Sequence, residues 1–257
     1  MTQKGQSLNR QRVWMPLPDD DFDTTEVAVP WKVLREAGHE VVFATERGGA
    51  APACDPKLID GVIFGRLGAK PKAIEAYREL EGSPEFNAPV SWSQIEPERF
   101  DGLVLAGGHA PGMKQYLGSV ELQAKVREFW ALERPVGAIC HGVLVLARAG
   151  VLGSTRTTCL TKSMEKGAYL LTSWRLGRYY RTYRAYVQDE VVAALDDAKQ
   201  FDAGPMATYS RPWVVEDGRY VSGRWPGDAS LFAERFEALL SAGPRPQPAA
   251  ATPRQAT

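Results

Sequence analysis

The sequence predicts an α/β fold in which a parallel sheet lies between helices on both faces. Apolar segments of strand length alternate along the chain with segments of helical periodicity, as in successive β–α–β units. A cysteine between an apolar run and an apolar helix predicts a sharp strand-to-helix turn within that fold. The 257 residues suffice for a full hydrophobic core in one large domain or two small ones.

The first half of the chain opens with an apolar strand over 11–17. A helix over 24–37 follows, with Asp23 as its expected N-cap, and Gly38 leads into a strand over 39–45. The next elements are expected as a helix over 70–80, a buried strand over 101–106 and a helix over 119–132.

In the second half, an apolar strand over 135–140 runs directly into an apolar helix over 142–150. Asp228 is the expected N-cap of the last helix. The remaining elements are expected as strands over 155–160 and 220–224 and helices over 183–196 and 227–241.

Residues 11–242 are expected to form a single domain, preceded by a flexible N-terminus at 1–10. The segment 52–92 is too long for a simple crossover and contains several prolines and glycines, so we interpret it as an insertion that caps the site. Residues 161–212 form a second irregular region. The Pro- and Ala-rich segment 243–257 is expected to be a disordered tail.

The charge balance argues against several classes of partner. Lys plus Arg equals Asp plus Glu, 31 each, so general electrostatics give no reason to expect a nucleic acid or a membrane surface as partner. The segment Trp174–Arg184 mixes arginines with tyrosines, and we interpret it as a helix or dimer surface rather than a nucleic-acid site.

The few cysteines and histidines limit the chemistry further. Three cysteines fit a reducing compartment, and with three histidines at no zinc spacing neither a metal nor another cofactor is expected. The N-terminus has no apolar signal core, and no run reaches membrane-spanning length. The protein is therefore expected to be cytoplasmic.

Cys140 is the candidate nucleophile. It ends the apolar run Pro135–Ile139 and precedes an apolar helix, which is the pattern of a nucleophile elbow. A helix N-terminus favours the thiolate, so the sequence predicts a lowered pKa for Cys140. The alternative is a structural cysteine at the end of a core strand, which is our interpretation of Cys159, while Cys54 is interpreted as a loop residue.

Gly107, Gly108 and His109 follow another buried strand and form a candidate oxyanion and substrate-binding loop. Glycines allow the backbone to approach a substrate closely, and the backbone N–H of His141 would supply a further donor. An ordinary strand-to-helix turn with a packed histidine is the alternative.

Glu26 is the candidate proton carrier, and its position has a second explanation. Asp23 and Glu26 have the spacing of a capping box, in which the glutamate would bond back to the N-cap backbone. Pro30 interrupts the same helix, which is consistent with a first turn that directs Glu26 elsewhere.

Together these segments resemble the ThiJ/PfpI superfamily, which has a flavodoxin-like, class I glutamine amidotransferase-like fold. The resemblance covers roughly residues 11 to 240 and rests on Glu26, the turn Ala37–Val41, Gly107–His109 and the elbow Ala138–Gly142. Cysteine followed by histidine is similar to the branch of glyoxalase III enzymes and heat-shock chaperones. The resemblance implies a homodimer, a role in stress response, and a glutamate that lies against the cysteine sulfur and exchanges a proton with it.

The same branch implies a cysteine–histidine–acid triad, with the acid downstream of the next strand. His141 would be the histidine, but no aspartate occurs in Thr157–Lys166. Glu165 is the nearby carboxylate there, and it is equally explained as an exposed residue beside Lys162 and Lys166.

The first functional hypothesis is a cofactor-independent lyase of glyoxalase III type that converts methylglyoxal to lactate through Cys140, Glu26 and His141. The second is a cysteine hydrolase or hydratase of protease-like, amidase-like or isonitrile-hydrating type. The third is a non-catalytic stress chaperone or redox sensor with an oxidisable thiolate.

Overall fold

The computed structural model describes residues 10–63 and 67–243. Nearly all of the N-terminus expected to be flexible, and all but one residue of the expected disordered tail, therefore lie outside the described residues. Within the described part of the chain, we find no helix that combines the length and the apolar character needed to cross a membrane.

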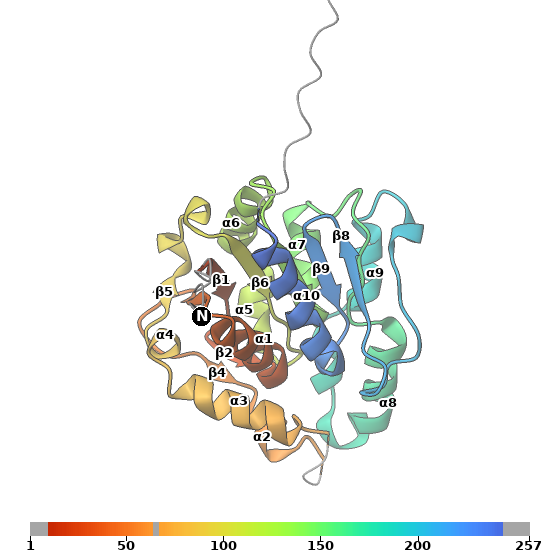
Figure 1. Ribbon diagram of the computed structural model, residues 1–257. Helices are drawn as coiled ribbons and strands as arrows, with labels where there is room; N and C mark the ends of the chain where they lie inside the picture. Colours follow the sequence, from red (N-terminus) through yellow and green to blue (C-terminus); the bar gives the residue numbers. More distant parts are fainter. Residues whose placement is uncertain (1–9, 64–66, 244–257) are drawn as a thin grey trace, which may run out of the picture.

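A seven-stranded sheet forms the centre of the molecule, in the order β5-β3-β1-β6-β7-β9-β8 (Figure 1). Its strands are β1 (Arg12–Pro16), β3 (Glu40–Thr45), β5 (Val90–Ser91), β6 (Gly102–Leu105), β7 (Val136–Ile139), β8 (Val214–Asp217) and β9 (Tyr220–Gly223). Neighbouring strands are parallel except for the β8–β9 pair. The predicted α/β parallel-sheet fold is confirmed.

Helices cover both faces of this sheet. In Figure 1, α1 (Thr24–Glu36) and α10 (Ala229–Ser241) lie in front, and α6 (Val120–Trp130) and α7 (Val143–Ala149) lie behind. Further helices are α2 (Pro56–Asp60), α3 (Pro71–Glu81), α4 (Pro84–Asn87), α5 (Met113–Gly118), α8 (Lys162–Leu176) and α9 (Val187–Ala193).

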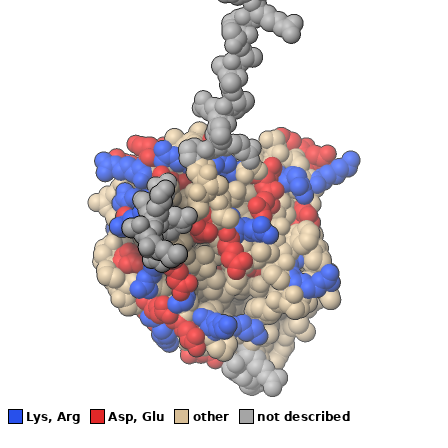
Figure 2. All heavy atoms as spheres, viewed as in Figure 1, with Lys and Arg blue, Asp and Glu red and all other residues tan. Residues whose placement is uncertain are grey.

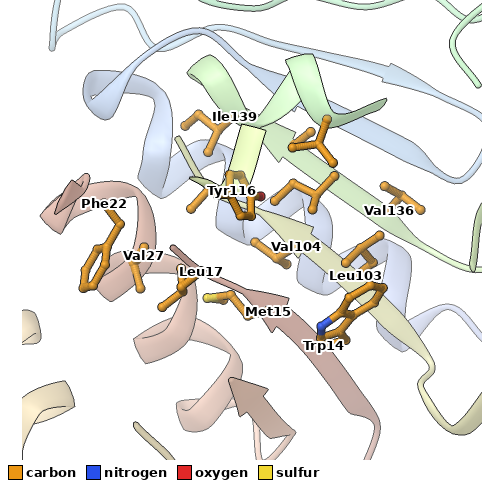
Figure 3. Packing of buried hydrophobic residues seen from close by; sticks show 14 of the residues in the cluster. Trp14, Met15, Leu17, Phe22, Val27, Leu103, Val104, Tyr116, Val136 and Ile139 are labelled. Carbon is orange, nitrogen blue, oxygen red and sulfur yellow. The ribbon is translucent and has the colours of Figure 1, made fainter. Parts of the chain in front are cut away.

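The core forms because the central strands are apolar on both faces, as parallel strands covered by helices must be. Trp14 and Met15 of β1 are fully buried and lie beside Leu103 and Val104 of β6 (Figure 3). The Trp14 ring meets Phe129 of α6 edge-on, with ring centroids 6.4 Å apart. This packing fixes the carboxyl ends of β6 and β7 side by side, where ligands bind in open α/β sheets.

The expected strand over 155–160 is wrong. Thr157 makes a single bridge to Phe201, and this segment is held by side-chain bonds instead. The Thr157 hydroxyl lies 2.9 Å from the Tyr220 hydroxyl, and the Thr158 N–H donates to Ser222 Oγ at 3.0 Å. Threonine and serine side chains thus supply hydrogen bonds to this buried segment that neighbouring strands would supply in a sheet.

The segments 52–92 and 161–212 contain more regular structure than the one helix expected in each. In the segment 52–92, β5 extends the main sheet, while β4 (Ala53–Cys54) pairs with β2 (Asp20–Phe22) in a separate two-stranded sheet. The second irregular region contains α8, and the helix expected over 183–196 is limited to α9.

Charged side chains of both signs are interspersed over the face of the molecule shown in Figure 2. This distribution agrees with the equal numbers of acidic and basic residues in the sequence.

Candidate active site

Cys140 occupies a strained turn at the end of β7. Its φ of +57° lies in the left-handed region, which costs a non-glycine residue about 1–3 kcal/mol. A short 3₁₀ turn, Cys140–Gly142, leads directly into α7. A Cβ at Gly142 would lie 2.2 Å from the Leu105 carbonyl oxygen, so only glycine allows this turn to pack against β6. The geometry is that of a nucleophile elbow.

The environment of the Cys140 thiol differs from the expectation of a lowered pKa. Burial raises its pKa well above the ordinary value, and the charges of Glu26 and Asp23 raise it further. A hydrogen bond from the His141 backbone N–H acts in the opposite direction but is outweighed. The prediction from the helix N-terminus is wrong because it ignored burial beside two carboxyls. A thiolate therefore needs a proton acceptor within the site.

Glu26 lies at the start of α1 and is fully buried. Asp23 Oδ1 accepts the N–H groups of Thr25 and Glu26, at 2.8 and 3.0 Å, as the N-cap was expected to do. The return bond of a capping box is absent among the described residues, because the Asp23 N–H donates to the Gly107 carbonyl at 2.9 Å. The Glu26 carboxyl is thus directed away from its own helix.

A backbone group holds the Glu26 carboxyl in place. The Gly107 N–H donates to Oε2 at 2.9 Å, and the Cys140 side chain lies close enough to affect the pKa of the carboxyl. Burial raises the pKa of Glu26 well above 4.5, and the charge of Asp23 raises it further. Burial also raises the pKa of Asp23 to about 6, against the two N–H bonds that it accepts. Burial thus favours the protonated forms of both the Glu26 carboxyl and the Cys140 thiol.

Gly107 separates this carboxyl from the cysteine. A Cβ at Gly107 would lie 2.7 Å from Glu26 Oε2, 2.7 Å from the His141 nitrogen and 2.9 Å from Cys140 Cβ. Gly107 was expected to supply an oxyanion donor, but its N–H is already bonded to Glu26. Gly108 has a φ of +153° and packs close to the Asp21 carbonyl and Met113. Gly107 therefore anchors the carboxyl.

Replacing Gly107 with alanine is expected to displace Glu26 and lower catalytic activity by about 10²-fold, the usual result of a misplacement near 1 Å. The free energy of unfolding should fall by about 1–3 kcal/mol because the methyl group overpacks the site. Gly118→Ala is the control, since a Cβ there has open space within 4 Å. Denaturant melts and steady-state kinetics check both effects, and equal activity in the two variants would contradict the anchoring role.

His141 lies beside the nucleophile, as the elbow was expected to allow. Its Nδ1 is 3.4 Å from Cys140 Sγ, and its ring is 5.5 Å from that of Tyr183. Burial lowers the pKa of His141 to about 3, with His109 and Arg148 contributing. The imidazole is therefore neutral at physiological pH, and either accepts or donates a hydrogen bond at the sulfur.

His109 lines the same site from the loop after β6. It stacks on Tyr180 with ring centroids 4.3 Å apart and meets Tyr179 edge-on at 4.7 Å. Burial lowers the pKa of His109 to about 4. The His109 ring lies 6.3 Å from the His141 ring. The two neutral histidines therefore lie in a row, with His141 next to the sulfur and His109 next to the tyrosines.

The structure does not bring Glu165 to His141. One carboxylate oxygen of Glu165 accepts from Arg181 at 3.0 Å, and the other accepts the Val187 N–H at 3.1 Å. Among the residues the structure describes, no hydrogen bond joins Glu165 to His141. Glu165 is buried within α8, contrary to the alternative of an exposed surface residue.

A cavity of about 930 Å³ lies over the cysteine. Besides Cys140, His109 and Asp23, its walls come from α8, from the loop 203–209 and from 224–226. No local sequence pattern predicts these walls, although Tyr180 comes from the segment in which arginines and tyrosines are interleaved.

Asp228 differs from its expected role. It precedes α10 as predicted, but its side chain makes no cap hydrogen bond there. It forms instead a buried ion pair with Arg224, whose Nε lies 2.8 Å from Oδ2. The Arg224–Asp228 pair holds the part of the cavity wall at 224–226. On the other side of the site, the Tyr179 hydroxyl donates a hydrogen bond to Asp55, the N-cap of α2. Neither pairing has a local sequence signal.

The described residues contain no cluster of three or more histidine, cysteine, aspartate or glutamate side chains arranged to hold a metal ion.

Comparisons with known proteins assign the chain to a family. The deglycase PfpI of Pyrococcus furiosus is 26% identical over 225 residues, covering 87% of this chain and 96% of that protein. A deglycase of Pyrococcus abyssi is 28% identical over 227 residues, with the same coverage. An uncharacterized protein of Schizosaccharomyces pombe is 26% identical over 247 residues, covering 92% of this chain and 86% of its own.

Solved structures share the fold. Glyoxalase III of Candida albicans superposes with a TM-score of 0.64 at 20% identity, covering 89% of this chain and 97% of that one. DJ-1beta of Drosophila melanogaster gives a TM-score of 0.57 at 21% identity, covering 90% and 91%. The model of the family described as ThiJ/PfpI family-like matches residues 17–205, so the chain belongs to the ThiJ/PfpI family.

Proposed function

We propose that the protein is a cofactor-independent enzyme of glyoxalase III type, which acts on small reactive carbonyl compounds through Cys140. The observation that carries this proposal is the buried Glu26 carboxyl, which accepts the Gly107 N–H beside Cys140, the cysteine that lines the cavity. A buried carboxyl with a raised pKa beside a nucleophile suits proton transfer near neutral pH. The names of the deglycase relatives and the glyoxalase III neighbour support chemistry on carbonyl compounds.

The reaction begins when Cys140 Sγ attacks the aldehyde carbon of methylglyoxal. The ionised Glu26 carboxylate accepts the thiol proton and passes it to the aldehyde oxygen, which gives a hemithioacetal and regenerates the carboxylate. The Glu26 carboxylate then removes the hydrogen from the thiol-bearing carbon, and the electron pair forms an enediolate. Return of that proton to the neighbouring carbon, together with transfer of the hydroxyl proton from the first oxygen to the second, gives the thioester of lactate.

Water completes the cycle by attacking the thioester carbonyl. The carbon–sulfur bond breaks, the thiol regains a proton, and lactate leaves. Neutral His141, 3.4 Å from the sulfur, is placed to hydrogen-bond the sulfur or the developing oxyanion. The reaction needs no external oxidant or reductant, because the aldehyde carbon is oxidised while its neighbouring carbon is reduced.

Deglycation is the second candidate function, and the names of three Pyrococcus and Thermococcus relatives favour it. An aldehyde carried as an adduct on an amine offers the same carbon to Cys140, and breaking the carbon–nitrogen bond would release the amine. Release of free amine from a methylglyoxal adduct of N-acetyl-lysine distinguishes this reaction from turnover of free methylglyoxal.

The test is formation of lactate from methylglyoxal, followed by proton NMR, without added thiol and with EDTA present. We expect turnover under these conditions, at a rate proportional to enzyme concentration. Turnover that requires glutathione, or hydrolysis of an amide or hydration of an isonitrile in place of lactate formation, would reject the glyoxalase assignment while retaining the site.

A further inference from the structure

The cavity over Cys140 is much larger than a three-carbon substrate needs. Its volume of about 930 Å³ lies in the range of pockets that enclose drug-sized ligands. Cys140 is itself one of the lining residues, although only 4% of its surface is exposed. Any compound bonded to the sulfur therefore occupies this cavity and contacts its walls.

Large apolar side chains also line the cavity. They include Leu58, Leu160, Met164, Leu171 and Met206. Leu171 and Met206 are 73% and 85% exposed, and Tyr209 beside them is also exposed. Apolar side chains that are both solvent-exposed and gathered around one concavity are typical of a ligand-binding surface.

The charged groups of the same walls are already engaged within the protein. Glu165 is paired with Arg181 at 3.0 Å, and Arg224 is paired with Asp228 at 2.8 Å. The Lys70 ammonium lies over the Tyr209 ring, 4.6 Å from its centroid. Introducing a second anion beside a paired arginine gains little, so these walls favour an uncharged ligand.

We propose that the cavity binds an uncharged 2-oxoaldehyde with an extended alkyl or aryl side chain, whose aldehyde meets Cys140 while the side chain packs against Leu171 and Met206. The inference rests on the proposed function, since the sulfur attacks the aldehyde carbon in the same way and the thiol proton again ends on the aldehyde oxygen. It adds that apolar contact in the outer cavity selects the substrate.

The experiment compares methylglyoxal with hexylglyoxal, which shares its reactive end. We expect kcat/KM to be about tenfold higher or more for hexylglyoxal, because even one buried methylene contributes a factor of about ten or more. The double variant Leu171→Gln/Met206→Gln should lose about fivefold or more of this preference, measured as the ratio of the two kcat/KM values.

A matched control uses exposed apolar residues outside the cavity. Leu170 neighbours Leu171 on α8 and is 64% exposed, and Val120 of α6 is 78% exposed, yet neither lines the cavity. Leu170→Gln/Val120→Gln should therefore keep the full preference for hexylglyoxal. An equal loss in both double variants, or no preference in the unmodified protein, would overturn the inference.

A second measurement does not depend on turnover. Alkylation of Cys140 by N-hexyliodoacetamide should be faster than alkylation by iodoacetamide, and the double variant Leu171→Gln/Met206→Gln should reduce this ratio. If no 2-oxoaldehyde is converted but this alkylation preference holds, the proposed function fails and the apolar binding site stands. If the variant instead turns a dimer into a monomer on size-exclusion chromatography without altering either preference, the surface is a subunit interface and the inference is wrong.

Discussion

Replacement of Cys140 with alanine is expected to lower lactate formation from methylglyoxal by about 10⁴-fold or more, to the level of the buffer blank. The reason is that the hemithioacetal and thioester both require the sulfur, and no neighbouring group can replace it. Cys140 is the one cysteine among the described residues that line the cavity, so no second thiol can form these intermediates there.

The other cysteines provide the controls for this prediction. Cys54 and Cys159 are also buried and unpaired, and burial raises the pKa of each. Cys54→Ala and Cys159→Ala should retain activity within a factor of a few after correction for any loss of folded protein. Thermal melts should confirm that Cys140→Ala remains folded. Full activity in Cys140→Ala toward every converted substrate would remove the basis of the nucleophile assignment.

Replacement of Glu26 with glutamine is expected to lower kcat by about 10²–10⁴-fold, the usual contribution of a positioned acid–base group. Glutamine can still accept the Gly107 N–H through its amide oxygen, so the loss reports proton transfer rather than a lost anchor. Glu165→Gln is the matched control, because Glu165 is a second buried glutamate on the cavity wall. A loss of equal size in Glu165→Gln would favour Glu165 as the missing acid.

The same variant should make Cys140 more reactive toward iodoacetamide while turnover falls. Burial is the main reason why the pKa of the thiol is raised, but the Glu26 charge is the next contribution, and glutamine removes it. The midpoint of a labelling-against-pH curve should therefore move to lower pH. If the midpoint instead moves to higher pH, the prediction is wrong. Glu26 would then stabilise the thiolate by donating a hydrogen bond to it, rather than disfavour the thiolate through its negative charge.

Stability should change in the direction opposite to activity. The folded-state pKa of Glu26 lies above its ordinary value of 4.5, so the folded protein binds this proton more tightly than the unfolded chain does. The contribution of Glu26 to stability is therefore greatest below pH 4.5 and is lost as the pH rises through the folded-state pKa. Glu26→Gln should raise Tm above that window and flatten its pH dependence, as expected where a site retains a destabilising group for function.

The strands that matter most for the site were predictable from local sequence. β1, β3, β6, β7 and β9 all lie within the expected ranges, because a strand buried on both faces must be a continuous apolar run. The elbow could be predicted for the same reason, since an apolar strand and an apolar helix meet at Cys140 without space for a loop.

Elements with weak local patterns were missed. β2, β4 and β5 are two or three residues long, too short to show a period. α8 exposes Leu170, Leu171 and Trp174 to solvent, so its apolar residues do not mark a buried face. Of these three side chains, Leu171 lines the cavity.

The sequence by itself singled out Cys140 as the candidate nucleophile and a glutamate near the start of the first helix as its candidate partner. Only the tertiary structure decided how these groups shift one another's pKa. The start of α1 supplies Asp23 and Glu26, while Gly107 follows β6 and Cys140 follows β7. The meeting of these three segments, distant in sequence, in a buried site raises the pKa of both Glu26 and Cys140. Desolvation and charge repulsion depend on burial and distance in three dimensions, which residue spacing along the chain does not specify.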